Sequence, residues 1–212
     1  MPRLPVLCTI RRRPQAIYWP LTVPFLLAAA AILFVTLALV RIGADAIAKL
    51  GISPYVALLI LMASLAGSAL NVPVGRIRSL VVAVNVGGAV VPAGLSGYLI
   101  VQDHLGWLAL AAVAIVAVAV HLVARPVPGL GIAVPTVLPG IFAAGTAILL
   151  NPVAIAGLAY VGGTLGTLIG ADLTNLRKVR GLGAPLVSIG GSGTFDGVFL
   201  AGIVAVLLTM LH

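Results

Sequence analysis

An uncharged apolar stretch near the amino terminus decides the class of fold. Residues 17–40 read IYWPLTVPFLLAAAAILFVTLALV and follow three arginines, Arg11, Arg12 and Arg13. Spanning a bilayer takes about 20 mainly apolar residues, whereas the apolar part of a secretory signal has about 7–15. The stretch therefore predicts an uncleaved first transmembrane helix rather than a signal peptide.

The composition of the chain agrees with a membrane protein. Of its 212 residues, 62% are hydrophobic and 8% are charged, whereas a soluble domain is about 25% charged. The net charge of +8 does not indicate a nucleic-acid partner, because the basic residues lie between apolar segments, as membrane-flanking charges do. Cys8 is the only cysteine, which excludes an intrachain disulfide and a cysteine metal cluster. We expect no cofactor and no metal.

Seven apolar segments are long enough to cross the bilayer. They cover residues 18–41, 53–71, 80–102, 106–124, 131–150, 152–171 and 189–211. Glycines and prolines predict breaks or bends in the third and fifth segments. The predicted fold is all-α: a polytopic bundle of about seven transmembrane helices in the inner (plasma) membrane, with the lipid bilayer around it. Residues 1–212 form one integral membrane domain, in which a basic cytoplasmic segment (1–17) precedes the bundle (18–212).

The basic residues predict the orientation of this bundle. With the N-terminus inside, the cytoplasmic parts hold all of the 12 Lys and Arg residues except Arg41 and Lys49. Cytoplasmic loops of membrane proteins carry an excess of Lys and Arg. We therefore predict a cytoplasmic N-terminus and an external C-terminus.

Two of the four acidic residues make up the predicted site. Asp172 ends the sixth segment and Asp196 lies near the start of the seventh, so both fall on the cytoplasmic side. A carboxylate near hydrocarbon is costly and is rarely kept without a role. Two neighbouring carboxylates share a proton, so that one acts as an acid while the other activates water. The alternative is that both acids cap helix ends.

Glycines surround the deeper of the two acids. Lacking β-carbons, they permit close helix contact or an unwound backbone beside a water-filled site. The predicted supporting residues are Gly190, Gly191, Gly193 and Gly197.

We predict an internal repeat that relates the second and third segments to the sixth and seventh. Residues 84–88 (VNVGG) resemble residues 187–191 (VSIGG), and upstream Asn71 matches Asp172. An offset of four segments makes this a parallel repeat. Because the first copy lacks the two aspartates, we expect chemistry in the second copy and a scaffold role for the first.

Two stretches carry a resemblance to known families. Residues 170–177 (GADLTNLR) and 188–197 (SIGGSGTFDG) resemble an uncharacterised family of prokaryotic multispanning proteins, a domain of unknown function, from Asn71 onward. More distantly, they are similar to the GxGD-type intramembrane aspartyl proteases: presenilin, signal peptide peptidase and the prepilin peptidases. This second resemblance implies that Asp172 and Asp196 are the two catalytic acids and that a transmembrane peptide is the substrate. The motif departs from that pattern, because two residues separate Gly193 from Asp196.

Three functions follow from these observations. The first is an intramembrane aspartyl protease-like hydrolase with the paired aspartates at its centre. The second is a small cation- or proton-coupled transporter or channel, in which Asp196 and the broken third and seventh segments form the site. The third is a non-catalytic membrane scaffold. His121 is expected to be a packed or interfacial residue, and Asp103 a solvated residue of an external turn.

Overall fold

The structure, a computed structural model, describes residues 22–77, 80–127, 131–151, 153–179, 186–191 and 197–211. The chain divides into two compact units, residues 1–40 and 41–212. In the first unit, helix α1 (Thr22–Ala48) begins and then runs on into the second unit. Large apolar side chains such as Phe25, Leu33 and Phe34 are exposed on it. An apolar helix with exposed side chains of this kind suits a lipid environment.

The second unit is mostly helical. Its α-helices are α2 (Pro54–Gly67), α3 (Val91–Gln102), α4 (Gly106–Val123), α5 (Leu138–Leu150), α6 (Ile155–Thr167), α7 (Leu176–Val179) and α8 (Gly197–Thr209). Two π-helical turns interrupt this pattern: η1 (Val86–Val90) leads into α3, and η2 (Leu168–Asp172) follows α6. A short 3₁₀ turn, η3 (Leu173–Asn175), connects η2 to α7.

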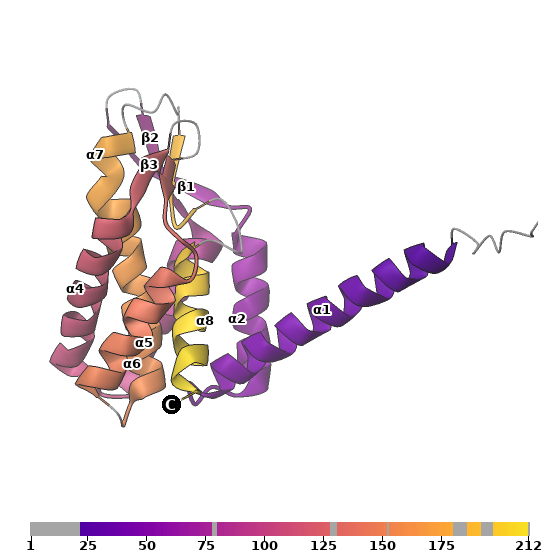
Figure 1. Ribbon diagram of the computed structural model, residues 1–212. Helices are drawn as coiled ribbons and strands as arrows, with labels where there is room; N and C mark the ends of the chain where they lie inside the picture. The colour runs from indigo at the N-terminus through magenta and orange to yellow at the C-terminus, as the bar shows by residue number, and fades with distance from the viewer. Residues whose placement is uncertain are drawn as a thin grey trace, which may run out of the picture. The chain divides into compact units, whose positions relative to one another are not determined.

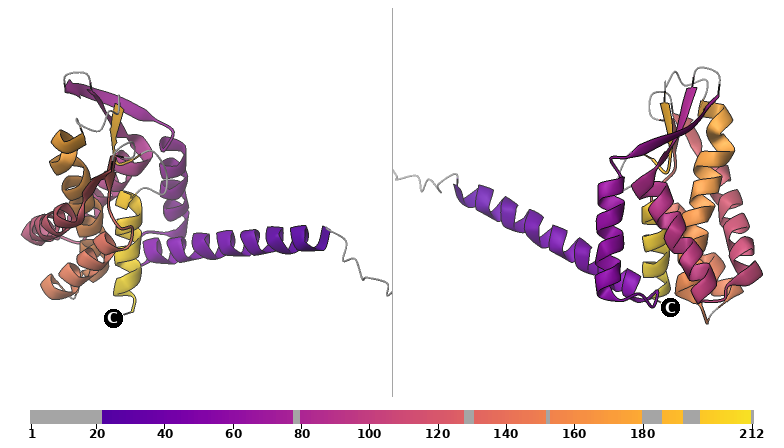
Figure 2. Two further views of the ribbon diagram at one scale, coloured as in Figure 1. Left: turned by 45° about the horizontal axis from the view of Figure 1, so that its top comes forward. Right: turned by 180° about the vertical axis from the view of Figure 1, so that it is seen from behind.

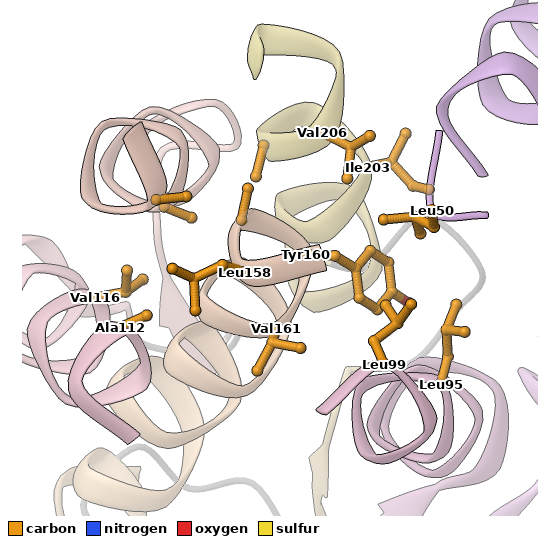
Figure 3. Packing of buried hydrophobic residues seen from close by; sticks show 14 of the residues in the cluster. Leu50, Leu95, Leu99, Ala112, Val116, Leu158, Tyr160, Val161, Ile203 and Val206 are labelled. Atoms are coloured by element: carbon orange, nitrogen blue, oxygen red, sulfur yellow. The ribbon is translucent and has the colours of Figure 1, made fainter. Parts of the chain in front are cut away.

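Helix α6 lies at the centre of the second unit and packs against α3, α4, α5 and α8. Glycines at four-residue spacing, Gly162, Gly166 and Gly170, face α4. A β-carbon at Gly166 would lie 2.7 Å from the Val116 β-carbon, and one at Gly170 would overlap the Ala117 carbonyl oxygen. Small residues at this spacing let membrane helices approach closely. Figure 3 shows Leu158 and Val161 of α6 among the buried apolar side chains of the core.

The five strands of the described residues lie at one end of the second unit, together with α7 (Figures 1 and 2). Three of them form a sheet in the order β1 (Asn71–Ile77), β2 (Leu80–Asn85), β5 (Leu186–Ile189). The central strand β2 pairs antiparallel with β1 and parallel with β5. The other two, β3 (Arg125–Val127) and β4 (Gly131–Ala133), pair as an antiparallel hairpin. We call this end of the unit the sheet end.

The strands correct the prediction of an all-α fold. The third and seventh predicted segments, 80–102 and 189–211, each begin as strand or turn and become helical only further on. Residues 80–84 read LVVAV, a β-branched composition that suits strands. A short apolar run of this kind cannot be told from a buried helix by periodicity alone, so the sequence pattern did not separate the two structures.

Among the described residues, three helical stretches are long and apolar enough to cross a membrane: Val23–Ala46, Gly106–Val123 and Ile155–Val179. These stretches indicate a membrane protein. The other apolar helices are shorter, and the 13 residues of α5 or α8 reach only about 20 Å at 1.5 Å per residue. A hydrocarbon core is about 30 Å thick. Seven complete transmembrane helices are therefore not confirmed.

Candidate functional site

Polar side chains meet where the strands of the sheet end and the helices begin. Asn71 starts β1, Asn85 ends β2 and Ser188 lies in β5, while Asp172 ends the π-helical turn η2. Gly190 follows β5 directly. Hydrogen bonds join Asn71, Asn85 and Ser188 in one set and Asp172 and Gly190 in a second. We call these five residues the polar junction.

Asn85 holds the first half of the junction together. Its side chain is fully buried, and its Nδ2 donates to the Ser68 carbonyl oxygen (2.8 Å) and to Asn71 Oδ1 (3.1 Å). Its Oδ1 accepts a hydrogen bond from the Gly88 N–H at 2.7 Å and so caps the turn η1. Asparagine is suited to such a cap because its short side chain reaches the backbone amides of the first turn.

Ser188 joins the two halves across the sheet. Its hydroxyl lies 2.5 Å from Asn71 Oδ1 and 2.8 Å from the Gly191 carbonyl oxygen. Since a hydroxyl carries one proton, its donation is divided between these two acceptors. Asn71 Oδ1 therefore accepts from Asn85 on one side and faces Ser188 on the other.

Asp172 is the only carboxylate of the polar junction. It is half-buried, and its Oδ2 accepts a hydrogen bond from the Gly190 N–H at 2.7 Å. Gly190 and Gly191 have φ angles of +81° and +68°, which only glycine adopts without strain. The chain can thus turn sharply after β5 and present its amide to the carboxylate. A half-buried carboxylate in this position can take up a proton or hold a cation.

The two glycine breaks of the proposed repeat touch each other. A β-carbon built at Gly88 would overlap the Gly190 carbonyl oxygen, and one built at Gly190 would lie 2.6 Å from the Ala89 β-carbon. Gly87 is equally confined, because a β-carbon there would overlap the Ser64 carbonyl oxygen. Glycine at these positions lets the backbones of α2, η1 and the turn after β5 approach each other.

A second polar cluster lies beside the junction, at the end of α4. His121 Nδ1 is 2.7 Å from the Thr174 hydroxyl and 3.4 Å from Asn175 Nδ2. Thr174 and the fully buried Asn175 both donate to the Gly170 carbonyl oxygen in the π-helical turn. The prediction of a packed or interfacial histidine is consistent with these contacts, which tie α4 to the interrupted end of α6.

The structure describes part of the predicted site. Asp172 and Gly190 bond to each other in the polar junction, and the next residue, Gly191, accepts from Ser188. Gly197 begins α8, where a β-carbon would meet open space. Asp196 and Gly193 lie outside the described residues. The pairing of Asp172 with Asp196 therefore stays a prediction.

Sequence reasoning gave Asn71, Asn85 and Ser188 no part in the predicted site, although it contained a signal for them. The repeat comparison matched Asn71 with Asp172 and Asn85 with Ser188, and these four residues all lie in the junction. Both copies run helix, connector, strand, glycine pair, helix. Their connectors differ, because residues 71–77 form a strand whereas residues 173–179 are helical.

At the opposite end of the second unit lies a cavity of about 420 Å³. Its polar lining comes from Lys49, Gln102 and Asp103, and residues 153–157 at the start of α6 complete it. A β-carbon at Gly157 would overlap Asp103 Oδ2, so the carboxylate lies directly over the first turn of α6. Asp103 is therefore in contact with a helix and is not simply a solvated turn residue. No group of three or more metal-ligating side chains comes together in the part of the chain that the structure describes.

Comparison with known proteins gives a family without an activity. A family model described as a protein of unknown function (DUF1614) matches residues 63–208. No curated protein and no solved structure matches the chain.

Proposed function

The chain belongs to the DUF1614 family of proteins of unknown function, whose description gives no activity, and we propose its function from the polar junction. The proposed function is that of a small cation- or proton-coupled membrane transporter or channel. The observation that carries the proposal is the place of Asp172. Its carboxylate ends an interrupted helix and accepts a hydrogen bond from the glycine turn of a second interrupted segment. Ion sites of secondary transporters are built in this way, from discontinuous helices whose unwound backbone lines the site.

The two π-helical turns support this proposal. They lie at the junction itself, since η1 contains Gly88 and η2 ends at Asp172. π-Turns within helices are frequent at functional sites. An irregular backbone at membrane depth is tolerated only where it is buried in protein or lines a water-filled space.

We place the sheet end at the cytoplasmic face of the inner (plasma) membrane. Among the residues that the structure describes, its exposed basic residues are Arg76 in β1, Arg125 in β3, and Arg177 and Lys178 in α7. Excess Lys and Arg mark the cytoplasmic side. In this arrangement seven segments enter the bilayer, the short helices among them are extended by their connectors, and the sheet lies at the membrane surface.

Reporter fusions test this orientation. Fusions after Arg78 and Arg180 are expected to report a cytoplasmic position, and fusions after His104 and His212 an external one, because basic loops resist translocation. Activity of a periplasmic reporter after Arg180 would contradict the orientation and place Asp172 on the outer side.

One observation favours the hydrolase as a second candidate. Gly190, which donates to Asp172, begins the glycine-rich stretch 190–197 in which Asp196 lies. Gly190, the residue bonded to Asp172, therefore precedes the other acid of the predicted pair by six positions in the chain. A transmembrane peptide is the substrate of this candidate.

A single preparation separates the two candidates. The full-length protein is reconstituted in liposomes that contain a pH-sensitive dye, and a membrane potential is imposed in buffers containing only Na⁺, only K⁺ or neither. We expect ion or proton flux above that of protein-free liposomes and no cleavage of a fluorogenic transmembrane peptide added to the same vesicles. Cleavage without flux would place the hydrolase first.

A further inference from the structure

Helix α6 carries a stripe of buried hydroxyl groups. The hydroxyl stripe consists of Tyr160, Thr164 and Thr167, which are 0%, 0% and 2% exposed. Spacings of four and three residues place the three side chains on one face of the helix. The Thr167 hydroxyl oxygen has no hydrogen-bond partner among the described residues, and the hydroxyls of Tyr160 and Thr164, one turn apart, have none there other than each other.

Other buried threonines of the second unit behave differently. Thr146 Oγ1 donates to the Phe142 carbonyl oxygen at 2.7 Å, and Thr209 Oγ1 donates to the Val206 carbonyl oxygen at 2.7 Å. A buried hydroxyl in a helix thus usually bonds to a preceding carbonyl. Buried polar groups in proteins are nearly always bonded to protein or to ordered water, so the hydroxyl stripe requires an explanation that Thr146 and Thr209 do not.

The hydroxyl stripe runs along the contact between α6 and α8. A β-carbon at Gly202 of α8 would overlap the Thr164 hydroxyl and lie 2.9 Å from the Tyr160 ring. Figure 3 shows the Tyr160 ring beside Leu99 of α3, with Leu50 and Ile203 nearby. Because Gly202 has no side chain, α8 packs directly against the hydroxyl side of α6.

An acidic side chain lies near each end of α6. Beyond Thr167, the π-helical turn η2 leads to the half-buried Asp172. One turn before Tyr160, the Asp103 carboxylate lies over Gly157, and both residues line the 420 Å³ cavity. The helix between Gly157 and Asp172 is about 22 Å long at 1.5 Å per residue. Acids thus lie beyond both ends of a buried hydroxyl stripe that spans about 10 Å, roughly half of this length.

We propose that the hydroxyl stripe is a hydrated proton path between the Asp103 cavity and Asp172. Water is the ligand that fits, because hydroxyls both donate and accept hydrogen bonds, whereas a dehydrated metal cation needs several oxygen ligands and usually carboxylates. In each step an oxygen of water or hydroxyl accepts one proton and releases another to the next oxygen. Asp172 takes up one proton as a carboxylic acid and releases it on the sheet side, so that one proton moves and no other bond changes. The inference rests on the proposed transport function and gives protons as the species moved.

Hydration of the stripe is tested without reference to transport. Cys8→Ser removes the only cysteine, and Thr164→Cys, Thr167→Cys and Val161→Cys each then introduce one thiol. Val161 is a matched control, because it is an apolar residue that is fully buried on the same helix. After transfer of lipid nanodiscs to D₂O, infrared spectra follow the conversion of S–H to S–D. We expect the Thr164 and Thr167 positions to exchange at least about tenfold faster than the Val161 position, since buried water reaches only polar sites.

Proton flux tests the path itself. Thr164→Val and Thr167→Val remove a hydroxyl and keep the shape, and each is expected to lower proton flux into liposomes by about tenfold or more, because a broken chain of hydrogen bonds interrupts transfer. Thr146→Val is the matched control and should leave flux within twofold of the wild type. Equal thiol exchange at all three positions would overturn the inference, as would unchanged flux in both stripe variants of a conducting protein. Fast exchange in a wild type without flux would overturn the transport proposal and leave the hydrated stripe standing.

Discussion

Replacing Gly88 by alanine is expected to destabilise the protein by about 3 kcal/mol, the upper part of the range for overpacking a closed core. The added β-carbon would overlap the Gly190 carbonyl oxygen and lie 3.3 Å from Asn85 Oδ1. Neither neighbouring atom can move away easily. The Gly190 oxygen belongs to the backbone, and the Asn85 side chain is held by three hydrogen bonds. The variant must separate η1 from the turn after β5, and with it Gly190 from Asp172.

Gly94→Ala is the matched control for this substitution. Gly94 lies in α3 and has no atom within 4 Å of its built β-carbon. Alanine there should leave stability unchanged or raise it by up to about 1 kcal/mol through helix propensity. Reversible unfolding in mixed detergent micelles, followed by circular dichroism, measures both variants. Equal stability of Gly88→Ala and Gly94→Ala would show that the two glycine breaks are not in close contact.

Replacing Asp172 by asparagine is expected to lower proton or cation flux by about 100-fold, the lower limit of what a positioned acid–base group contributes. Asparagine keeps an oxygen that can accept the Gly190 N–H bond, so the fold should be retained. What is lost is the negative charge and the exchangeable proton. Asp45→Asn is the control, because it makes the same chemical change at an exposed position of α1.

The same substitution has a different signature in a hydrolase. Both acids would then serve one chemical step, so Asp172→Asn and Asp196→Asn should each abolish peptide cleavage. The double variant should be little worse than either single variant, since residues that act as a unit are not additive. Full flux and unchanged peptide turnover in Asp172→Asn would contradict both candidates and leave Asp172 as a structural acceptor for Gly190.

Much of the coarse architecture could be read from apolar runs. Each of the seven predicted segments overlaps a helix of the structure. The pairing of Asp172 with Asp196 as the site stays a prediction. The strands were not predicted, because a β-branched apolar run such as residues 80–84 satisfies both structures equally well. Pairing decides between them, since β2 becomes a strand through the hydrogen bonds that β1 and β5 provide on its two edges.

The individual contacts of the site needed the tertiary structure. The repeat comparison brought Asn71, Asn85 and Ser188 to notice, but which atoms bond depends on the sheet register, and a pattern of residue types does not specify a register. The hydroxyl stripe is a similar case. Thr164 and Thr146 are both threonines in apolar helices. In the structure Thr146 donates to the Phe142 carbonyl oxygen of its own helix, whereas the Thr164 hydroxyl lies against Gly202 of α8.

By itself the sequence determined that this is a membrane protein, where its apolar segments lie and which acids to test. The reason is that charged residues are costly in hydrocarbon, so the few acids beside apolar segments are easily recognised. The tertiary structure alone decided which backbones touch and which polar atoms are paired. Gly88 meets Gly190 over about a hundred intervening residues, and Asp172 bonds to an amide in another element. Whether such a contact forms depends on differences of a few tenths of an ångström in the distance between segments that are remote in the chain. Local composition does not specify these distances.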